Sequence, residues 1–204
     1  MTNTLYACST NPGKLKEFAL AARDHSLACA AIEPLPNLAD ICPPEETGRS
    51  FEENARLKAY YYSSFTSGIV FADDSGLEVD ALGGAPGIYS ARYAGPGAND
   101  SANNKLLLQK LCGETNRQAR FVCAIAAAHA GQVLYTAHAA VEGEILTSLR
   151  GENGFGYDPL FLYPPLQRSL AEIGAEQKFA ISHRGKAMRE LLRWFGERFC
   201  GHTR

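Results

Sequence analysis

The chain has 204 residues, 46% of them hydrophobic, and a net charge of -2 at pH 7. A chain of this size and composition can bury a full core, which argues against intrinsic disorder and fits one domain or one domain with a small lobe. Its weak net charge argues against duplex nucleic acid or an anionic membrane as the main partner. The sequence has no apolar run of membrane-spanning length and no secretory-signal pattern, so we expect a cytoplasmic protein.

The cysteines indicate free thiols. They are scattered without any Cys-x-x-Cys pair, at Cys8, Cys29, Cys42, Cys112, Cys123 and Cys200. This spacing weighs against a zinc site, and a reducing cytoplasm would keep the thiols unpaired.

The first expected unit is a strand over residues 5–8, a polar loop and a helix with apolar residues at helical spacing. The apolar positions of the helix are Leu15, Phe18, Ala19 and Ala22. The loop consists of Ser9, Thr10, Asn11, Pro12, Gly13 and Lys14. Its hydroxyls, amide, lysine and helix N-terminal N–H groups suit a phosphate, although it lacks the first glycine and the final hydroxyl of a Walker A loop. An ordinary turn with a solvated lysine is the alternative.

An acidic loop precedes the second expected helix. Residues 33–49 contain four prolines and are expected to be irregular, with Glu45 and Glu46 near their end. Ser50 and Glu53 have the spacing of a capping box and predict a helix start. The apolar positions of that helix are Phe51, Ala55, Ala59 and Tyr62. The glutamates are either metal-directed carboxylates or a solvated acidic turn near a helix N-terminus.

Two adjacent carboxylates form the centre of the sequence pattern. Residues 69–72 are apolar and lead into Asp73, Asp74, Ser75 and Gly76. We expect a buried strand that ends in a polar turn at the carboxylates, where open α/β sheets bind ligands. Neighbouring strand residues point to opposite sides, so one carboxylate should face the ligand and hold Mg²⁺ or accept a proton from water. A turn without chemical function is the alternative.

A hairpin is predicted in the second half of the chain. Residues 121–125 and 133–137 have strand character, and a turn near residues 130–132 joins them. Beside the earlier parallel units, this hairpin makes the sheet mixed. His129 and His138 lie in or at the ends of these strands, and we interpret both as structural.

Two further helices are predicted from cap and apolar patterns. Asp100 or Ser101 should cap the first, and Ser182 the second, which is the terminal helix. Their apolar positions are Leu107, Leu108 and Leu111 in the first, and Leu191, Leu192, Phe195 and Phe199 in the second.

Two loops in the last third of the chain have ligand-binding character. Residues 151–159 combine glycines with two aromatic rings, which lets the backbone approach a flat ligand while a ring stacks on it. Residues 178–186 place cationic side chains at a helix N-terminus, where the macrodipole disfavours them unless an anion binds. A connecting loop whose aromatics cover the core, and a solvated basic turn, are the respective alternatives.

Taken together, five stretches resemble the RdgB/Ham1 family of non-standard purine nucleoside triphosphate pyrophosphatases, the relatives of inosine triphosphatase. They are residues 9–14, residues 45–48 with 51–55, residues 72–77 with 83–93, residues 154–159, and residues 181–185. The resemblance implies an α/β fold with a mixed sheet flanked by helices, two lobes and a central active-site cleft. Residues 1–204 would form a single domain of this kind, without a separable linker.

The resemblance also implies the activity. Family members hydrolyse a nucleoside triphosphate between the α- and β-phosphates with Mg²⁺, which clears ITP, dITP and XTP from nucleotide pools. We therefore expect a homodimer with a purine nucleoside triphosphate as its substrate and no nucleic-acid or membrane partner. The enzymatic alternative is a pyrophosphatase for pyrimidine or other modified nucleotides. A module that stacks single-stranded nucleic acid on Phe155 and Tyr157 is the non-enzymatic alternative.

The site residues follow from the resemblance, position by position. Asp74 matches the catalytic proton acceptor and a metal ligand, and Glu46, with Glu45 as the other choice, matches a second metal ligand. The substrate contacts match Ser9, Thr10, Asn11, Pro12, Gly13, Lys14, Ser75, Phe155, Gly156, Tyr157, Asp158, Lys178, His183 and Arg184. Phe155 would stack on the purine, while donors on Lys178, His183 or Arg184 would favour a 6-keto over a 6-amino group.

Overall fold

The structure is a computed structural model that describes residues 3–23 and 30–200. Its strands are β1 (Asn3–Ala7), β2 (Ala30–Pro34), β3 (Ile69–Val79), β4 (Gln118–His129), β5 (Gln132–Ile145), β6 (Phe161–Tyr163) and β7 (Arg168–Ser169). Its α-helices are α1 (Pro12–Arg23), α2 (Phe51–Tyr62), α3 (Asp100–Lys110), α4 (Ala175–Ile181) and α5 (His183–Phe199). Short 3₁₀ helices cover Leu38–Asp40, Ser63–Phe65, Asp80–Leu82, Gly87–Arg92, Pro164–Leu166 and Leu170–Glu172.

One mixed sheet contains all of these strands, in the order β2-β1-β3-β4-β5-β6-β7. The first three pair in parallel, because β1 runs alongside both β2 and β3 in the same direction. The β5–β6 and β6–β7 pairs are antiparallel. Ala130 and Gly131 join the neighbouring strands β4 and β5, as a hairpin requires. The predicted mixed α/β sheet with flanking helices is therefore confirmed.

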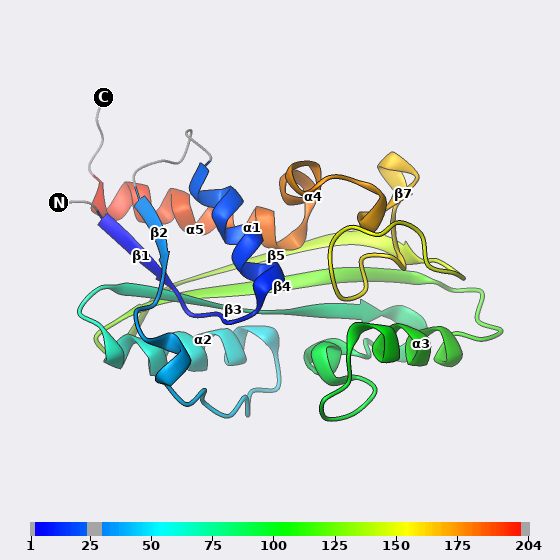
Figure 1. Ribbon diagram of the computed structural model, residues 1–204, viewed down its shortest axis with the longest axis horizontal. Helices are drawn as coiled ribbons and strands as arrows, with labels where there is room; N and C mark the ends of the chain where they lie inside the picture. Colours follow the sequence, from blue (N-terminus) through cyan, green and yellow to red (C-terminus); the bar gives the residue numbers. More distant parts are fainter. Residues whose placement is uncertain (1–2, 24–29, 201–204) are drawn as a thin grey trace. The chain divides into compact units, whose positions relative to one another are not determined.

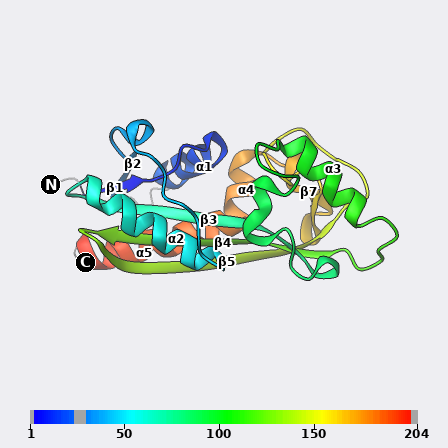
Figure 2. The ribbon, with the colours of Figure 1, turned by 90° about the horizontal axis from the view of Figure 1, so that it is seen from below.

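The chain divides into two compact units. Unit 1 comprises Met1–Asp74, Cys123–Ala139 and Arg184–Arg204, and unit 2 comprises Ser75–Val122 and Ala140–His183. In unit 1, α1 and α5 lie on one face of the sheet and α2 on the other (Figures 1 and 2). Within unit 2, α3 and α4 likewise lie on opposite faces of the strands (Figure 1).

Each unit has its own apolar core. In unit 1 the rings of Phe18 on α1 and Phe71 on β3 meet edge to face, with centroids 5.0 Å apart. In unit 2 a buried cluster of apolar side chains joins β3, α3, β4, β5 and β6 around Leu107 and Phe161. Burial of this apolar surface is the main term that stabilises both units.

Helix α2 begins as the sequence predicts. The Ser50 hydroxyl accepts a hydrogen bond from the Glu53 N–H at 3.1 Å, which satisfies one of the helix's first donors. The Glu53 carboxylate accepts from the Arg49 N–H at 2.7 Å, one residue before the cap. All four predicted apolar positions of this helix are buried.

Four expectations need correction. Strand β3 does not end at Asp73 but continues to Val79, because the ammonium groups of Lys14 and Lys58 neutralise the two carboxylates inside the sheet. The cap of α3 is Asn99, whose side chain accepts from the Ala102 N–H. A strand, β2, occupies the start of the supposed irregular loop, with its proline at the last position of an edge strand. Phe199 remains 37% exposed and packs on aromatic rings of its own helix.

Two further observations concern the cysteines and the membrane. The five cysteines that the structure describes are all free, and Cys29 lies outside the described residues. No helix within the described ranges is both long and apolar enough to cross a membrane.

Candidate active site

The predicted phosphate loop caps the start of α1. The Asn11 side-chain oxygen accepts from the Lys14 N–H at 3.1 Å, and the Ser9 hydroxyl accepts from the Asn11 N–H at 3.3 Å. Pro12 occupies the first helical position, where its missing N–H costs nothing. The loop therefore forms the N-terminus of a twelve-residue helix, which is a favourable place for an anion.

A buried ion network lies on one side of β3. Lys14 Nζ is 3.0 Å from Asp73 Oδ1, and Arg184 Nε donates to Asp73 Oδ2 at 3.1 Å. The Arg184 guanidinium also contacts the carboxylate of Glu17 on α1. Burial alone would raise the pKa of Asp73, but Lys14 and Arg184 hold it well below its usual range. Asp73 therefore stays ionised and fixes the lysine of the phosphate loop.

The next residue of β3 faces a different group. Asp74 Oδ1 lies 2.9 Å from Lys58 Nζ, and Asp74 Oδ2 accepts from the Asn54 amide at 3.2 Å. Lys58 Nζ also donates to Glu46 Oε1 at 2.8 Å. Burial raises the pKa of Asp74, and the attraction of Lys58 opposes this rise only in part. Asp74 is thus the more basic of the two adjacent carboxylates, which is the property a proton acceptor needs.

The alternation of β3 explains why the two carboxylates differ. Consecutive strand residues point to opposite faces, so Asp73 meets α1 and α5 while Asp74 meets α2. The opposite directions of the two side chains agree with the sequence prediction. Glu46, rather than Glu45, shares a cation with Asp74, and Glu45 is exposed.

The carboxylates of Glu46 and Asp74 fit the donor preference of Mg²⁺. Both present an oxygen to one cationic group, within 2.9 Å of Lys58 Nζ. Mg²⁺ prefers oxygen ligands and commonly takes one or two carboxylates from a protein, with water and phosphate oxygens completing the shell. The residues present are therefore suitable for this ion.

The glycine-rich loop of unit 2 is held by its own Asp158 and by contacts from outside the loop. Asp158 is buried, and its carboxylate accepts from the Phe155 N–H at 2.8 Å and from Lys178 Nζ at 2.5 Å. The Lys178 ammonium lies 4.5 Å from the centre of the Phe155 ring, as in a cation–π contact. Tyr157 donates its hydroxyl to the Ser90 carbonyl at 2.8 Å. The predicted run 155–158 is therefore a fixed turn.

The remaining predicted contacts divide between the two units. His183 belongs to unit 2, where its ring stacks on Phe121 with centroids 4.8 Å apart, and it is buried. Arg184 follows it directly but belongs to unit 1, in the ion network of Asp73. Ser75 lies in β3 immediately after Asp74.

Three polar residues of this site were missed by sequence reasoning, namely Glu17, Asn54 and Lys58. Asn54 and Lys58 are one turn apart on α2, on the side of the predicted apolar positions. Glu17 is likewise one turn after Lys14 on α1 and precedes the buried Phe18. Their position among the apolar residues of an amphipathic helix was the sequence signal that could have identified them as site residues.

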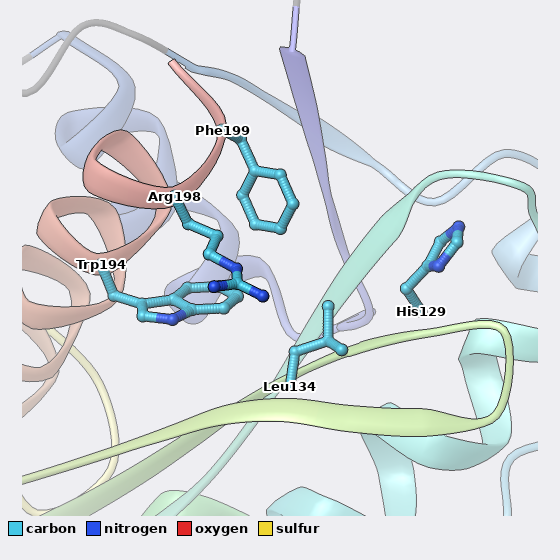
Figure 3. Close-up of a pocket in the computed structure, with 5 residues that line it drawn as sticks. All are labelled: His129, Leu134, Trp194, Arg198 and Phe199. Atoms are coloured by element: carbon cyan, nitrogen blue, oxygen red, sulfur yellow. The ribbon is translucent and has the colours of Figure 1, made fainter. Parts of the chain in front are cut away.

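A pocket elsewhere in unit 1 contains none of the predicted site residues. It is lined by His129, Leu134, Trp194, Arg198 and Phe199, and the three residues of α5 face Leu134 across it (Figure 3). The indole of Trp194 also stacks on Tyr135, with ring centroids 4.8 Å apart.

The fold and the charged groups together define a class: a mixed α/β protein whose carboxylate pair and lysines suit phosphate chemistry. Comparison with known sequences then identifies the family. Residues 5–194 match the Ham1 family, so the chain belongs to it. The resemblance inferred from the five stretches is confirmed.

Individual relatives agree with this assignment. A protein of Exiguobacterium sp. named dITP/XTP pyrophosphatase is 50% identical, over 92% of this chain and 94% of its own. One of the same name from Acidobacterium capsulatum is 48% identical, over 94% and 98%. Among solved structures, the Ham1 protein of Coxiella burnetii has a TM-score of 0.85 at 38% identity, covering 97% of this chain and all of that one. The Staphylococcus aureus Ham1 protein has a TM-score of 0.82 at 42% identity, covering 96% and 100%.

Proposed function

We propose that this chain is a nucleoside triphosphate pyrophosphatase that hydrolyses ITP, dITP and XTP to the monophosphate and pyrophosphate. The observation that carries this proposal is the convergence of Asp74 and Glu46 on Lys58, next to the Asp73–Lys14 pair. A relative that is 50% identical and named dITP/XTP pyrophosphatase supports the choice of substrate.

The residues of unit 1 would act on the triphosphate. Lys14 and the first N–H groups of α1 would bind phosphate oxygens, because the ammonium is cationic and the N–H groups at a helix start carry partial positive charge. Asp73 would keep the Lys14 ammonium in place. Lys58 would reduce the repulsion between the carboxylates and the anionic substrate.

Asp74 would accept the proton of the attacking water. Its raised pKa makes it a stronger base than an exposed aspartate, and Asn54 holds its second oxygen. Glu46 and Asp74 would hold Mg²⁺, which when bound neutralises negative charge on the phosphates. Asp73 cannot take over the role of base, because its cationic neighbours keep it ionised and its pKa low.

The glycine-rich loop of unit 2 would bind the base. The Phe155 ring offers an aromatic face for stacking on a purine, and Lys178 fixes this ring through Asp158. Donors in this region favour the 6-keto group of hypoxanthine or xanthine over the 6-amino group of adenine. The nucleobase would therefore determine which nucleoside triphosphates bind tightly.

Pyrophosphate release from ITP, dITP, XTP, GTP, ATP, CTP and UTP, with and without Mg²⁺ at mildly alkaline pH, tests the proposal. We expect Mg²⁺-dependent release from ITP, dITP and XTP, with much slower release from ATP, CTP and UTP. Equal release from pyrimidine nucleotides would overturn the choice of base and favour the alternative pyrophosphatase. Absence of release from every nucleotide would overturn the enzymatic proposal itself.

We also propose a cytoplasmic homodimer, on the strength of the family resemblance. The chain has a mass of 22.1 kDa, so light scattering on the eluted protein should report twice that value. A monomer mass at micromolar concentration would contradict the dimer.

A further inference from the structure

Both backbone groups of Gly156 are held by helix α3. The Asp100 carboxylate accepts from the Gly156 N–H at 2.7 Å, and the Asn104 amide donates to the Gly156 carbonyl at 2.9 Å. Asp100 and Asn104 are four residues apart on α3, so they lie one above the other on the same helix face. A single helix therefore fixes the centre of the glycine-rich loop from both sides.

The other residues of the loop are anchored differently. Asp158 holds the Phe155 N–H from within the loop, and Ser90 accepts from the Tyr157 hydroxyl. Gly156 lies between these two aromatic residues and has a φ of 63°, a conformation that favours glycine. The orientation of its peptide groups therefore decides how the backbone passes from Phe155 to Tyr157.

Burial of the polar Asn104 side chain lowers stability unless its amide group forms a hydrogen bond. Only 6% of Asn104 is exposed, and its side-chain oxygen has no hydrogen-bond partner among the described residues. A buried acceptor without a partner lowers stability, whereas an apolar side chain in the same place would not. The hydrogen bond to Gly156 is the interaction that the Asn104 amide makes.

We propose that Asp100 and Asn104 are positioning residues for base recognition, which act by holding Gly156 so that the Phe155 ring is presented to the purine. The inference rests on the proposed function, because it assigns the base to this loop. Neither residue would touch the phosphates or the attacking water. Their loss should therefore weaken base binding more than it slows the chemical step.

The variants Asp100→Ala, Asp100→Asn and Asn104→Ala separate positioning from helix stability. Asp100→Ala removes the acceptor of the Gly156 N–H, while Asp100→Asn keeps an oxygen acceptor and removes only the charge in the first turn of α3. We expect Asp100→Ala and Asn104→Ala to raise KM for ITP roughly tenfold, with kcat changed less than about threefold. Asp100→Asn should restore KM to near the wild-type value.

Lys105→Ala is the matched control, because Lys105 is exposed on the same helix. It should leave KM and kcat unchanged. The inference is overturned if Asp100→Asn raises KM as much as Asp100→Ala, since the charge rather than the acceptor would then matter. It is equally overturned if the alanine variants lower kcat and leave KM unchanged.

Hydrogen exchange of the loop gives a readout that does not depend on turnover. In Asp100→Ala and Asn104→Ala, amide exchange in residues 154–158 should be faster, with no change in helix α3. The wild-type protein could prove to hydrolyse no nucleotide while both variants still show faster exchange. That result would support the positioning and contradict only the proposed function. Unchanged exchange in both variants would contradict the positioning.

Discussion

Two neighbouring aspartates show how strongly an environment can separate identical side chains. Asp73 faces Lys14 and Arg184, which keep its pKa low. Asp74 faces Lys58, whose attraction is too weak to cancel the rise in pKa that burial causes. Groups whose surroundings push their pKa values apart are typical of acid–base sites. Of the two carboxylates, Asp74 is therefore the stronger base.

Asp74→Asn tests this assignment. Asparagine keeps the shape of the side chain but cannot accept the proton, so pyrophosphate release from ITP should fall by about 10²–10⁴-fold. The thermal unfolding midpoint should change little, because Glu46 still pairs with Lys58. Asp40→Asn at an exposed position is the control and should retain full turnover. An active Asp74→Asn protein would exclude Asp74 as the base.

Arg184 is a stability residue as much as a candidate contact. It is 2% exposed and bridges the carboxylates of Asp73 and Glu17. Arg184→Met would leave two buried carboxylates with one fewer cation, so we expect the free energy of unfolding to fall by about 3–5 kcal/mol. Urea denaturation measures this change. Arg193→Met, at an exposed position of the same helix, should leave the unfolding midpoint unaltered.

At the scale of elements, helix α2 holds the Asp74 carboxylate in place. Helix α2 is apolar toward the sheet, yet Asn54 and Lys58 interrupt that face. Asn54 also accepts from the Gly48 N–H at 2.8 Å, which ties the acidic loop to the helix that holds Asp74. The side-chain amide of Asn54 therefore links the acidic loop to Asp74.

Gly154 shows how tightly the glycine-rich loop is packed. A Cβ at this position would lie 2.1 Å from Asp158 Oδ2, and its φ of 77° already disfavours other residues. Gly154→Ala should therefore lower the free energy of unfolding by on the order of 3 kcal/mol.

Gly156→Ala is the matched comparison, because its φ is also positive but no atom lies within 4 Å of the added Cβ. Backbone strain alone should cost about 1–2 kcal/mol there. Chemical denaturation of both variants separates strain from the clash. Equal losses of stability would show that the contact with Asp158 is relieved by a local shift.

At the scale of the whole molecule, neither unit is continuous in sequence. The chain passes between them within β3, β4 and β5, and again between His183 and Arg184. Cleavage of a single peptide bond would therefore not separate one unit from the other. We therefore propose that residues 1–204 form one cooperative domain.

Cooperative unfolding can be measured with the single tryptophan, Trp194, which reports on unit 1. Its fluorescence and the far-UV circular dichroism of the whole chain should give the same midpoint and slope in urea. Two separate midpoints would contradict a single domain. A fluorescence change before the loss of ellipticity would show that unit 1 unfolds first.

The sequence by itself determined several of the elements and the family. Periodicity and caps predicted α2 and its four buried positions, and the five stretches indicated the Ham1 family before any geometry was available. These features are local, since a helix cap or an apolar repeat depends on residues within a few turns. The opposite directions of Asp73 and Asp74 also followed from strand geometry alone.

Only the tertiary structure decided which charges meet. Lys58 is 16 residues from Asp74 in the chain, and Arg184 is 111 residues from Asp73. A run of polar residues after an apolar strand predicts a turn, yet β3 continues through it because those distant cations neutralise the carboxylates. Long-range pairing of this kind has no local signature, because the Coulomb attraction depends on distance in space rather than in sequence.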